Sequence, residues 1–240
     1  MMTAAQANVA ADAVAYHASL AQHWEQRYCK PSLQMRETVL LQSLRGWNLA
    51  GSLWLDAGCG SGALSRWLAA RGCGVLGVDA SHEMVGAANQ SAQLQEYSER
   101  LDFVRITSVA HLALDDASLD GVLCSSVLEY MPDPSACLAE FARVLKPGGL
   151  LVVSVPNRNS LVRRMQLGCH YFGSRLGQSW CKFLDYSRHQ YSPGEFARLL
   201  SLSGFAERKL VPFGGPLPGL ARRSRRWAPL LMFVAQKREI

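Results

Sequence analysis

The stretch Leu53-Trp54-Leu55-Asp56-Ala57-Gly58-Cys59-Gly60-Ser61-Gly62 decides the fold. Its apolar start predicts a short buried strand over 53–56, and its three glycines predict a tight loop. Residues 63–71 are mostly apolar at helical spacing, so we expect a helix to follow the loop directly. A strand that passes through glycines into a helix brings its backbone close to a bound ligand.

Asp79 is the second informative residue, because it ends the next predicted strand, 75–79, seventeen residues beyond Gly62. A carboxylate in that place can accept hydrogen bonds from both hydroxyls of an adenosine ribose. Two ligands fit this geometry, a dinucleotide and S-adenosylmethionine. Asp56 would repel a pyrophosphate but suits an ammonium, and the loop departs from the G-x-G-x-x-G spacing. The residues therefore favour S-adenosylmethionine.

Strand and helix patterns alternate along most of the chain. Further strands are predicted at 102–106, 121–126, 150–155, 205–211 and 230–235, and helices at 81–90, 135–144 and 193–202. Strands separated by helical stretches of this length indicate βαβ units. We expect an α/β fold with a Rossmann-like, seven-stranded, mostly parallel sheet whose last strand is antiparallel.

Four motifs together resemble the class I S-adenosylmethionine-dependent methyltransferases. They are the glycine loop, Val78-Asp79-Ala80-Ser81 with Met84, the segments Leu119–Val122 and Val127–Tyr130, and Arg143-Val144-Leu145-Lys146-Pro147-Gly148-Gly149. The resemblance covers residues 20–156 and is strongest to the small-molecule branch, such as the O-methyltransferases of ubiquinone biosynthesis. It implies S-adenosylmethionine as cofactor and methyl transfer to a small-molecule acceptor, with a hydroxyl group as the expected site.

The resemblance also assigns the cofactor contacts at the first two strands. Asp56 would hold the methionine ammonium, directly or through water, and Asp79 would bind the ribose diol. Gly58 and Gly60 would let the backbone approach the ligand.

Further cofactor contacts are implied at the later strands. Ala80 and Met84 would flank the adenine, and Ser125 would end the fourth strand beneath the sulfonium. Members of the family often carry an Asp at the end of the third strand, where we expect Ser108 instead, with the Val109 N–H as an additional contact.

His189 is the candidate catalytic base, because methylation of a hydroxyl usually needs a base or a metal ion. It follows the irregular stretch 157–192 and precedes a predicted helix cap at Ser192 and Pro193, and a packing or capping role is the alternative. Tyr130 is the second candidate, since it occupies a position where the family often has His. The Cys and His spacings fit no zinc pattern, so no metal site is expected.

We interpret the 240 residues as a single domain. Residues 1–50 would form a helical lid, with two helices around 24–28, and 51–156 the cofactor-binding core. Residues 157–192 would be an insertion on the acceptor side, and 193–240 the closing helix and strand pair. The lid and the insertion would cap the carboxyl ends of the strands.

Charge is distributed unevenly along the chain. Residues 1–155 carry 10 basic and 15 acidic side chains, whereas 156–226 carry 13 basic and 3 acidic ones. The basic part, especially the run 222–227 with its four arginines and a tryptophan, suits an anionic acceptor or a membrane surface. A plain solvated loop is the alternative. Nucleic acid is not an expected partner, because no RNA-binding module accompanies the charge.

Composition excludes several protein classes. Hydrophobic residues make up 49%, enough for a core, and no apolar run is long enough to cross a bilayer. The start has no basic region typical of a secretory signal, and the seven cysteines form no CxxC pair, so we expect a cytoplasmic protein, with peripheral contact with a membrane as an open alternative. The alternatives are N- or C-methylation, an RNA methyltransferase, an NAD(P)-dependent oxidoreductase and a non-enzymatic binding module. The oligomeric state is left open.

Overall fold

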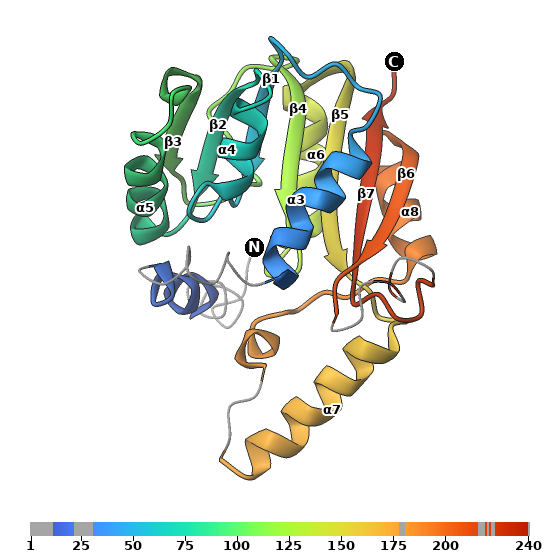
Figure 1. Ribbon diagram of the computed structural model, residues 1–240. Helices are drawn as coiled ribbons and strands as arrows, with labels where there is room; N and C mark the ends of the chain where they lie inside the picture. The colour runs from blue at the N-terminus through green and yellow to red at the C-terminus, as the bar shows by residue number, and fades with distance from the viewer. Residues whose placement is uncertain are drawn as a thin grey trace.

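Seven strands form one sheet in the order β3-β2-β1-β4-β5-β7-β6 (Figure 1). The computed structural model describes residues 12–21, 31–177, 181–215, 219, 221 and 224–239. The strands are β1 (Leu53–Ala57), β2 (Gly74–Asp79), β3 (Leu101–Arg105), β4 (Leu119–Ser125), β5 (Leu145–Pro156), β6 (Phe205–Phe213) and β7 (Leu230–Lys237). Each overlaps an apolar run that predicted a strand, so the predicted seven-stranded sheet is confirmed.

The carboxyl ends of β1, β2 and β4 lie at one edge of the sheet. β1 pairs in parallel with both β2 and β4, and β4 pairs in parallel with β5. The order of strands along the chain reverses between β1 and β4, and open α/β sheets bind ligands at the carboxyl ends beside such a reversal. β7 is antiparallel to β5 and to β6, as predicted for the last strand.

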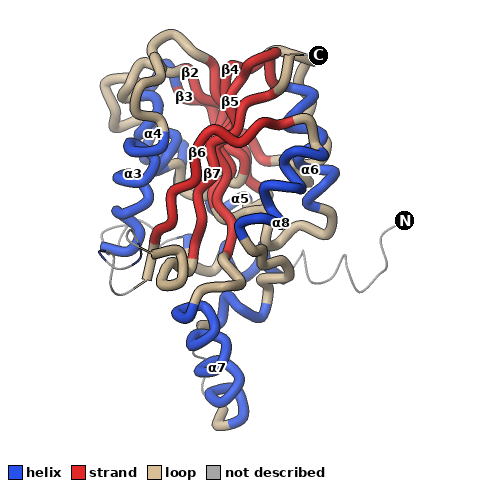
Figure 2. The backbone as a smooth tube through the Cα atoms, turned by 90° about the vertical axis from the view of Figure 1, so that its right-hand side faces the viewer, coloured by secondary structure: helices blue, strands red, loops and turns tan. Residues whose placement is uncertain are grey.

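Helices cover both faces of the sheet (Figure 2). The first face holds α3 (Pro31–Ser43), α4 (Ala63–Ala69) and α5 (His82–Ala92), and the second holds α6 (Pro134–Val144) and α8 (Pro193–Leu202). Residues 12–18 are also helical, and two short 3-10 helices, η2 (Ser98–Arg100) and η3 (Lys182–Asp185), lie in connections. The predicted segment 24–28 lies outside the described residues.

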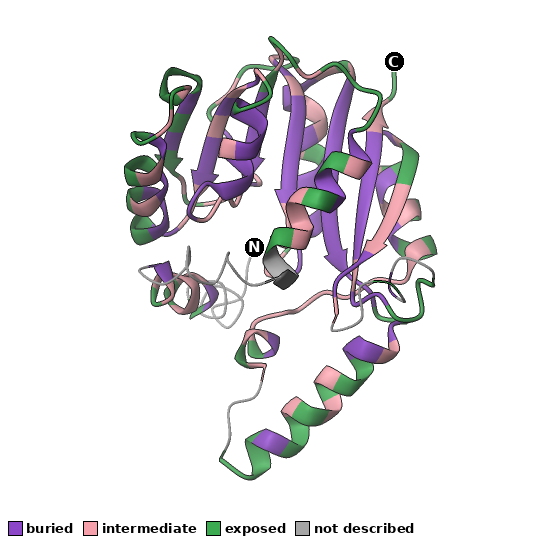
Figure 3. Cartoon of the chain, viewed as in Figure 1, coloured by how far each residue is buried: buried purple, intermediate pink, exposed green. Residues whose placement is uncertain are grey.

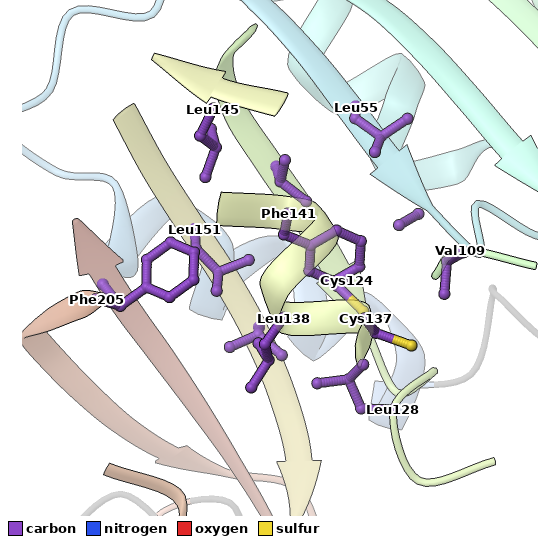
Figure 4. Packing of buried hydrophobic residues seen from close by; sticks show 14 of the residues in the cluster. Leu55, Val109, Cys124, Leu128, Cys137, Leu138, Phe141, Leu145, Leu151 and Phe205 are labelled. Carbon is purple, nitrogen blue, oxygen red and sulfur yellow. The ribbon is translucent and has the colours of Figure 1, made fainter. Parts of the chain in front are cut away.

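The core has two halves because neighbouring residues of a strand point to opposite faces of the sheet. Figure 4 shows the half under α6, where Phe141 packs near Cys124 of β4 and Leu151 of β5. On the other face, Trp54 of β1 is fully buried. Gly121 leaves room for it, since a Cβ at that position would lie 2.3 Å from the indole ring.

Polar caps fix where the helices on the second face begin. The Asp133 carboxylate accepts hydrogen bonds from two N–H groups in the first turn of α6. Ser192 forms a capping box with Glu195 at the start of α8, and Pro193 takes the first helical position. The predicted cap at Ser192 is therefore confirmed.

The stretch 157–192 is not irregular throughout, which corrects the sequence-based expectation. It contains α7 (Leu161–Arg175), a helix of 15 residues capped by Ser160. Figures 1 and 3 show α7 extending away from the sheet with most of its surface exposed. Its buried residues are Val162, Arg163 and Gly173. Its apolar residues Val162, Met165, Cys169 and Phe172 recur three or four residues apart, so the sequence does carry the periodicity of an amphipathic helix, which the interpretation as an irregular stretch overlooked.

Candidate functional site

The glycine loop between β1 and α4 has a backbone that requires glycine. Gly58, Gly60 and Gly62 have φ angles of 74°, 55° and 76°, in the left-handed region that other residues rarely adopt. The Gly58 N–H donates to the carbonyl of Val78 at 2.8 Å, which joins the loop to β2. A Cβ on Gly58 would lie 2.2 Å from Cγ2 of Val127, so the loop also touches the segment that follows β4.

Asp79, the last residue of β2, points its carboxylate at this loop. Oδ2 accepts a hydrogen bond from the Gly60 N–H at 2.9 Å, and Oδ1 accepts one from the Ser81 N–H at 2.9 Å. A carboxylate can accept about four hydrogen bonds, so each oxygen retains capacity for a ligand hydroxyl. The side chain is therefore held in place while it can still bind a ribose diol.

Asp56, in β1, is buried and acidic. It accepts a hydrogen bond at 2.6 Å from the hydroxyl of Ser65 in α4. Burial raises the pKa of the Asp56 carboxyl from 3.8 to about 7, the Ser65 hydroxyl opposes that rise, and the charge of Asp79 adds to it. A cation placed beside Asp56 would favour its ionised form.

The predicted adenine contacts are spread over two connections. Ala80 directly follows β2, and Met84 lies in the first turn of α5 with its side chain fully buried. Ser108 does not end the third strand as expected, because β3 ends at Arg105. Its Oγ accepts the N–H of Ala110 at 3.1 Å in a turn, and the neighbouring Val109 is buried in the core. The strand itself was predicted over 102–106, within one residue of β3, and Ser108 lies three residues beyond its end.

At the end of β4, a cation from α3 meets two serines. Nη1 of Arg36 donates to Oγ of Ser125 at 2.6 Å, and Nη2 donates to Oγ of Ser126 at 3.0 Å. The Ser126 N–H and hydroxyl also lie within 3.4 Å of the Ser154 hydroxyl of β5. Ser125 thus lies at the predicted edge of the sheet, and a guanidinium accompanies it there.

His189 and Tyr130 come together although 59 residues separate them in the sequence. The His189 ring places Nε2 at 2.9 Å from the carbonyl oxygen of Met131, and its main-chain N–H donates to the carbonyl of Glu129 at 3.3 Å. A carbonyl can only accept, so Nε2 carries the proton and Nδ1 of the neutral ring is left as the acceptor. Burial, and secondly the charge of Glu129, raise the pKa of Tyr130, so its phenol stays protonated at neutral pH.

Tyr130 belongs to a cluster of four aromatic side chains, and the other three were not among the predicted site residues. The ring centroids of Tyr16 and Tyr186 are stacked 5.1 Å apart, and those of His17 and Tyr130 meet edge to face at 5.2 Å. Residues 12–18 therefore pack against the acceptor-side segment at the carboxyl edge of the sheet. Nothing in the local sequence indicates that Tyr16 and His17 approach residues more than a hundred positions away.

Arg36 is the other residue whose part in the site could not be assigned from sequence. One signal was present, since Arg36 shares a helix face with the buried Val39 and Leu40, where a charge is unusual. Its partners are 89 and 90 residues away, and local patterns do not indicate them.

The residues at this edge fit an S-adenosylmethionine-like ligand. The glycine loop ends β1 with no side chain at Gly58 or Gly60, and Asp79 retains acceptors for a diol. The Asp56 carboxyl suits the ammonium of an amino acid, and the Arg36 guanidinium suits its carboxylate. Among the described residues, no three His, Cys, Asp or Glu side chains gather into a group that could hold a metal ion.

The sequence is similar to known methyltransferases. The profile of the family described as "Methyltransferase domain" matches residues 55–153. A ubiquinone biosynthesis O-methyltransferase from Dechloromonas aromatica is 34% identical over 170 residues, which cover 68% of each chain. The enzyme of that name from Psychrobacter arcticus is 32% identical over 168 residues, which cover 68% of this chain and 62% of that one.

Solved structures share the fold. A magnesium protoporphyrin IX methyltransferase from Synechocystis, solved with bound S-adenosylhomocysteine, aligns with a TM-score of 0.68 at 23% identity over 90% of this chain and 93% of its own. A putative methyltransferase from Haloferax volcanii, solved in complex with the activator Trm112, gives a TM-score of 0.66 at 21% identity, covering 93% and 98%.

Proposed function

This chain belongs to the methyltransferase domain family and is an S-adenosylmethionine-dependent O-methyltransferase of small molecules, and from that premise we propose that its acceptor is a planar aromatic hydroxyl compound. The observation that carries the proposal is the aromatic cluster of Tyr16, His17, Tyr130 and Tyr186, because Tyr130 lies between Glu129 and Met131, whose carbonyls accept hydrogen bonds from His189. Aromatic side chains favour stacked or edge-to-face contact with another ring, which would orient a flat acceptor.

His189 is the proposed general base. S-adenosylmethionine, when bound, supplies a methyl group on a positively charged sulfur, which makes the methyl carbon electrophilic. His189 would accept the hydroxyl proton at Nδ1, because Nε2 donates to the Met131 carbonyl and fixes the ring orientation. Tyr130 would donate a hydrogen bond to the acceptor rather than take a proton, since its pKa is raised by burial.

The proposed cofactor contacts follow the geometry at the ends of β1, β2 and β4. Asp79 would bind the ribose diol, and Asp56 the ammonium. Arg36 would bind the carboxylate beside Ser125. The remaining proposed contacts are Gly58, Gly60, Ala80, Met84, Ser108 and Val109. Holding both partners in line for displacement is the main help that such a site gives to methyl transfer.

The test of this function begins with binding. Calorimetric titration with S-adenosylhomocysteine, NAD and NADP should show micromolar binding of the first alone. Methyl transfer from labelled S-adenosylmethionine should then be measured with a catechol, a phenol, an aniline and an aliphatic alcohol of similar size. Transfer to the catechol or the phenol is expected. Transfer to the aniline or the alcohol alone would contradict the proposed acceptor, and binding of a nicotinamide alone would contradict the cofactor site.

We also propose that the protein works in the cytoplasm in peripheral contact with an anionic membrane. Met165, Tyr171 and Phe172 of α7, and Leu176 directly after it, have exposed fractions of 53 to 75%. Exposed arginines accompany them on α7 and at 225–226, next to the partly exposed Trp227. Apolar and basic side chains on one projecting element suit a negatively charged lipid surface, and a second copy with the same excess of positive charge would be repelled. Arg222 and Arg223 of the predicted contact lie outside the described residues.

Sedimentation with lipid vesicles tests this contact. No described helix is long and apolar enough to span a bilayer, so binding should be reversible and weakened by salt. The double variant Phe172→Ser/Leu176→Ser should bind less to vesicles containing phosphatidylglycerol. Leu94→Ser, which alters another highly exposed leucine, is the matched control. Equal binding of both variants would remove α7 from the proposed surface.

A further inference from the structure

We propose that Arg163 is a positioning residue of the acceptor side, which through a buried ion pair with Glu129 holds the segment carrying His189 against the end of β4. This inference rests on the proposed function, because it takes His189 as the group that meets the acceptor. Neither Arg163 nor Glu129 was among the predicted site residues.

The ion pair is buried and is completed by a hydroxyl. Nη2 of Arg163, in the first turn of α7, lies 3.4 Å from Oε2 of Glu129, and the two side chains are 3% and 4% exposed. The same Nη2 donates to Oγ of Ser187 at 3.0 Å, and that hydroxyl donates to Oε2 of Glu129 at 2.7 Å. The Arg163 guanidinium also lies over the ring of Phe183, 5.4 Å from its centroid. One arginine thus joins α7 to both the β4–α6 connection and the segment 183–187.

The main chain beside this pair carries His189. The carbonyl of Glu129 accepts the N–H of Arg188 at 2.8 Å and that of His189 at 3.3 Å. Two residues on, the Met131 carbonyl accepts from the His189 ring. The segment 187–189 therefore binds both the side chain and the main chain of Glu129. A movement of the Glu129 carboxylate would shift His189. It would also shift Tyr130, which lies in the chain between the carbonyls of Glu129 and Met131.

The buried charges of Glu129 and Arg163 are not explained by the stability of the fold alone. Burial raises the pKa of Glu129 and lowers the pKa of Arg163, which shows that both charged forms lose hydration. Apolar residues of similar volume often replace such a pair with no loss of stability, whereas removal of one partner leaves a buried charge uncompensated. What apolar residues cannot reproduce is the directional contact with Ser187, two residues before His189.

The variants are chosen to separate positioning from folding. Glu129→Met/Arg163→Met removes both charges and should fold, and Arg163→Lys keeps a charge but loses the planar guanidinium that lies over Phe183. Asp120→Asn/Lys146→Met is the matched control, because it removes an ion pair of 2.7 Å at the opposite edge of the sheet. Each protein is measured by thermal unfolding, calorimetry with S-adenosylhomocysteine, amide hydrogen exchange and methyl-transfer kinetics.

For Glu129→Met/Arg163→Met we expect affinity for S-adenosylhomocysteine within about 3-fold of the parent. Amide exchange should rise at least about 10-fold in the peptide spanning 183–191 but not in 150–155, and kcat/KM for the acceptor should fall by a similar factor. For Arg163→Lys, both the amide exchange at 183–191 and kcat/KM should lie between those of the parent and the double variant. The control should match the parent in local exchange and in kcat/KM.

Parent-like exchange at 183–191 in both Arg163 variants would overturn the proposal. So would increased exchange throughout the protein, because that outcome indicates general destabilisation. Amide exchange is measured without an acceptor, so it tests the positioning role even if the parent methylates none of the tested compounds. Failure of the proposed function and failure of this inference are therefore distinguishable.

Discussion

The carboxylate of Asp79 accepts a hydrogen bond from the N–H of Gly60 at 2.9 Å, so the acid at the end of β2 and the glycine loop after β1 form one unit. The second oxygen of the carboxylate is held by the N–H of Ser81 at the start of α5. Both elements of the predicted cofactor site are thus tied to each other before any ligand arrives, which reduces the ordering that binding requires.

Replacement of Asp79 should weaken cofactor binding. Asp79→Ala removes the proposed acceptors for the ribose diol together with the support for Gly60, so the Kd for S-adenosylhomocysteine should rise at least about 100-fold. Asp79→Asn keeps one oxygen acceptor, so its Kd should lie between those of the parent and Asp79→Ala. Calorimetry gives both values, and Glu83→Gln, which alters an exposed acid on α5, is the control. An unchanged Kd in Asp79→Ala would remove Asp79 from the site.

Cofactor affinity should depend on pH through Asp56. Its pKa is raised to about 7 by burial, so below this pH the free protein holds a proton that a neighbouring ammonium would displace. Binding then releases a proton, and the affinity for S-adenosylhomocysteine should fall by about 20-fold as the pH drops from 7.5 to 5.5. Well above pH 7 the carboxyl is fully ionised without a ligand, and the affinity should level off.

Calorimetry in two buffers of different ionisation enthalpy measures the released proton directly. Asp56→Asn cannot ionise and should bind more weakly at pH 7.5, with no pH dependence between 5.5 and 7.5. If the parent releases no proton at pH 6, Asp56 does not face the ligand ammonium.

Much of the cofactor side could be predicted from the sequence because its determinants are local. The apolar run before Asp56, the glycines after it and the acid at Asp79 each act within one strand–loop–helix unit, and hydrogen bonds join these units as expected. Ser108 lies in the turn after β3 and not at the strand end, and its contact with the cofactor stays a prediction. Arg105 pairs with Asp79, and both strands stop there.

The acceptor side could be predicted only in part, because long-range contacts build it. The role of His189 stays a prediction. Arg36 and Tyr16 lie 89 and 170 positions from Ser125 and Tyr186, and Arg163 lies 34 and 24 positions from Glu129 and Ser187. No periodicity links such positions. α7 is a different case, because Val162, Met165, Cys169 and Phe172 recur at helical spacing and the helix could have been predicted from this local pattern.

Arg36 should recognise the carboxylate of the ligand. A charge-assisted hydrogen bond is worth about 1.5–3 kcal/mol, so Arg36→Met should weaken binding of S-adenosylhomocysteine by about 10- to 100-fold. For a thioether analogue that lacks the carboxylate, Arg36→Met and the parent should have equal affinity. Arg36→Lys should recover part of the loss. If Arg36→Met weakens both ligands equally, Arg36 holds Ser125 and Ser126 in place without touching the ligand.

Gly58 should not accept a side chain. In Gly58→Ala the backbone φ of 74° is strained and the new Cβ would lie 2.2 Å from Val127, so we expect a loss of about 2–5 kcal/mol in the free energy of unfolding. Gly51→Ala is the matched control, because Gly51 has φ 78° but open space around it, and it should lose about 1–2 kcal/mol. Urea unfolding measures both, and equal losses would show that the contact with Val127 relaxes freely.

His189 should be needed for turnover but not for cofactor binding. His189→Ala removes the proposed base and should lower kcat by about 100- to 10,000-fold, with the Kd for S-adenosylhomocysteine within about 3-fold of the parent. His189→Gln separates the two roles of the ring, because its amide can donate to the Met131 carbonyl as Nε2 does but cannot take a proton at neutral pH. A base predicts that His189→Gln is as slow as His189→Ala. If His189→Gln instead keeps most of the parent's kcat, the ring serves to hold the segment on β4, and the acceptor loses its proton to another group or to water.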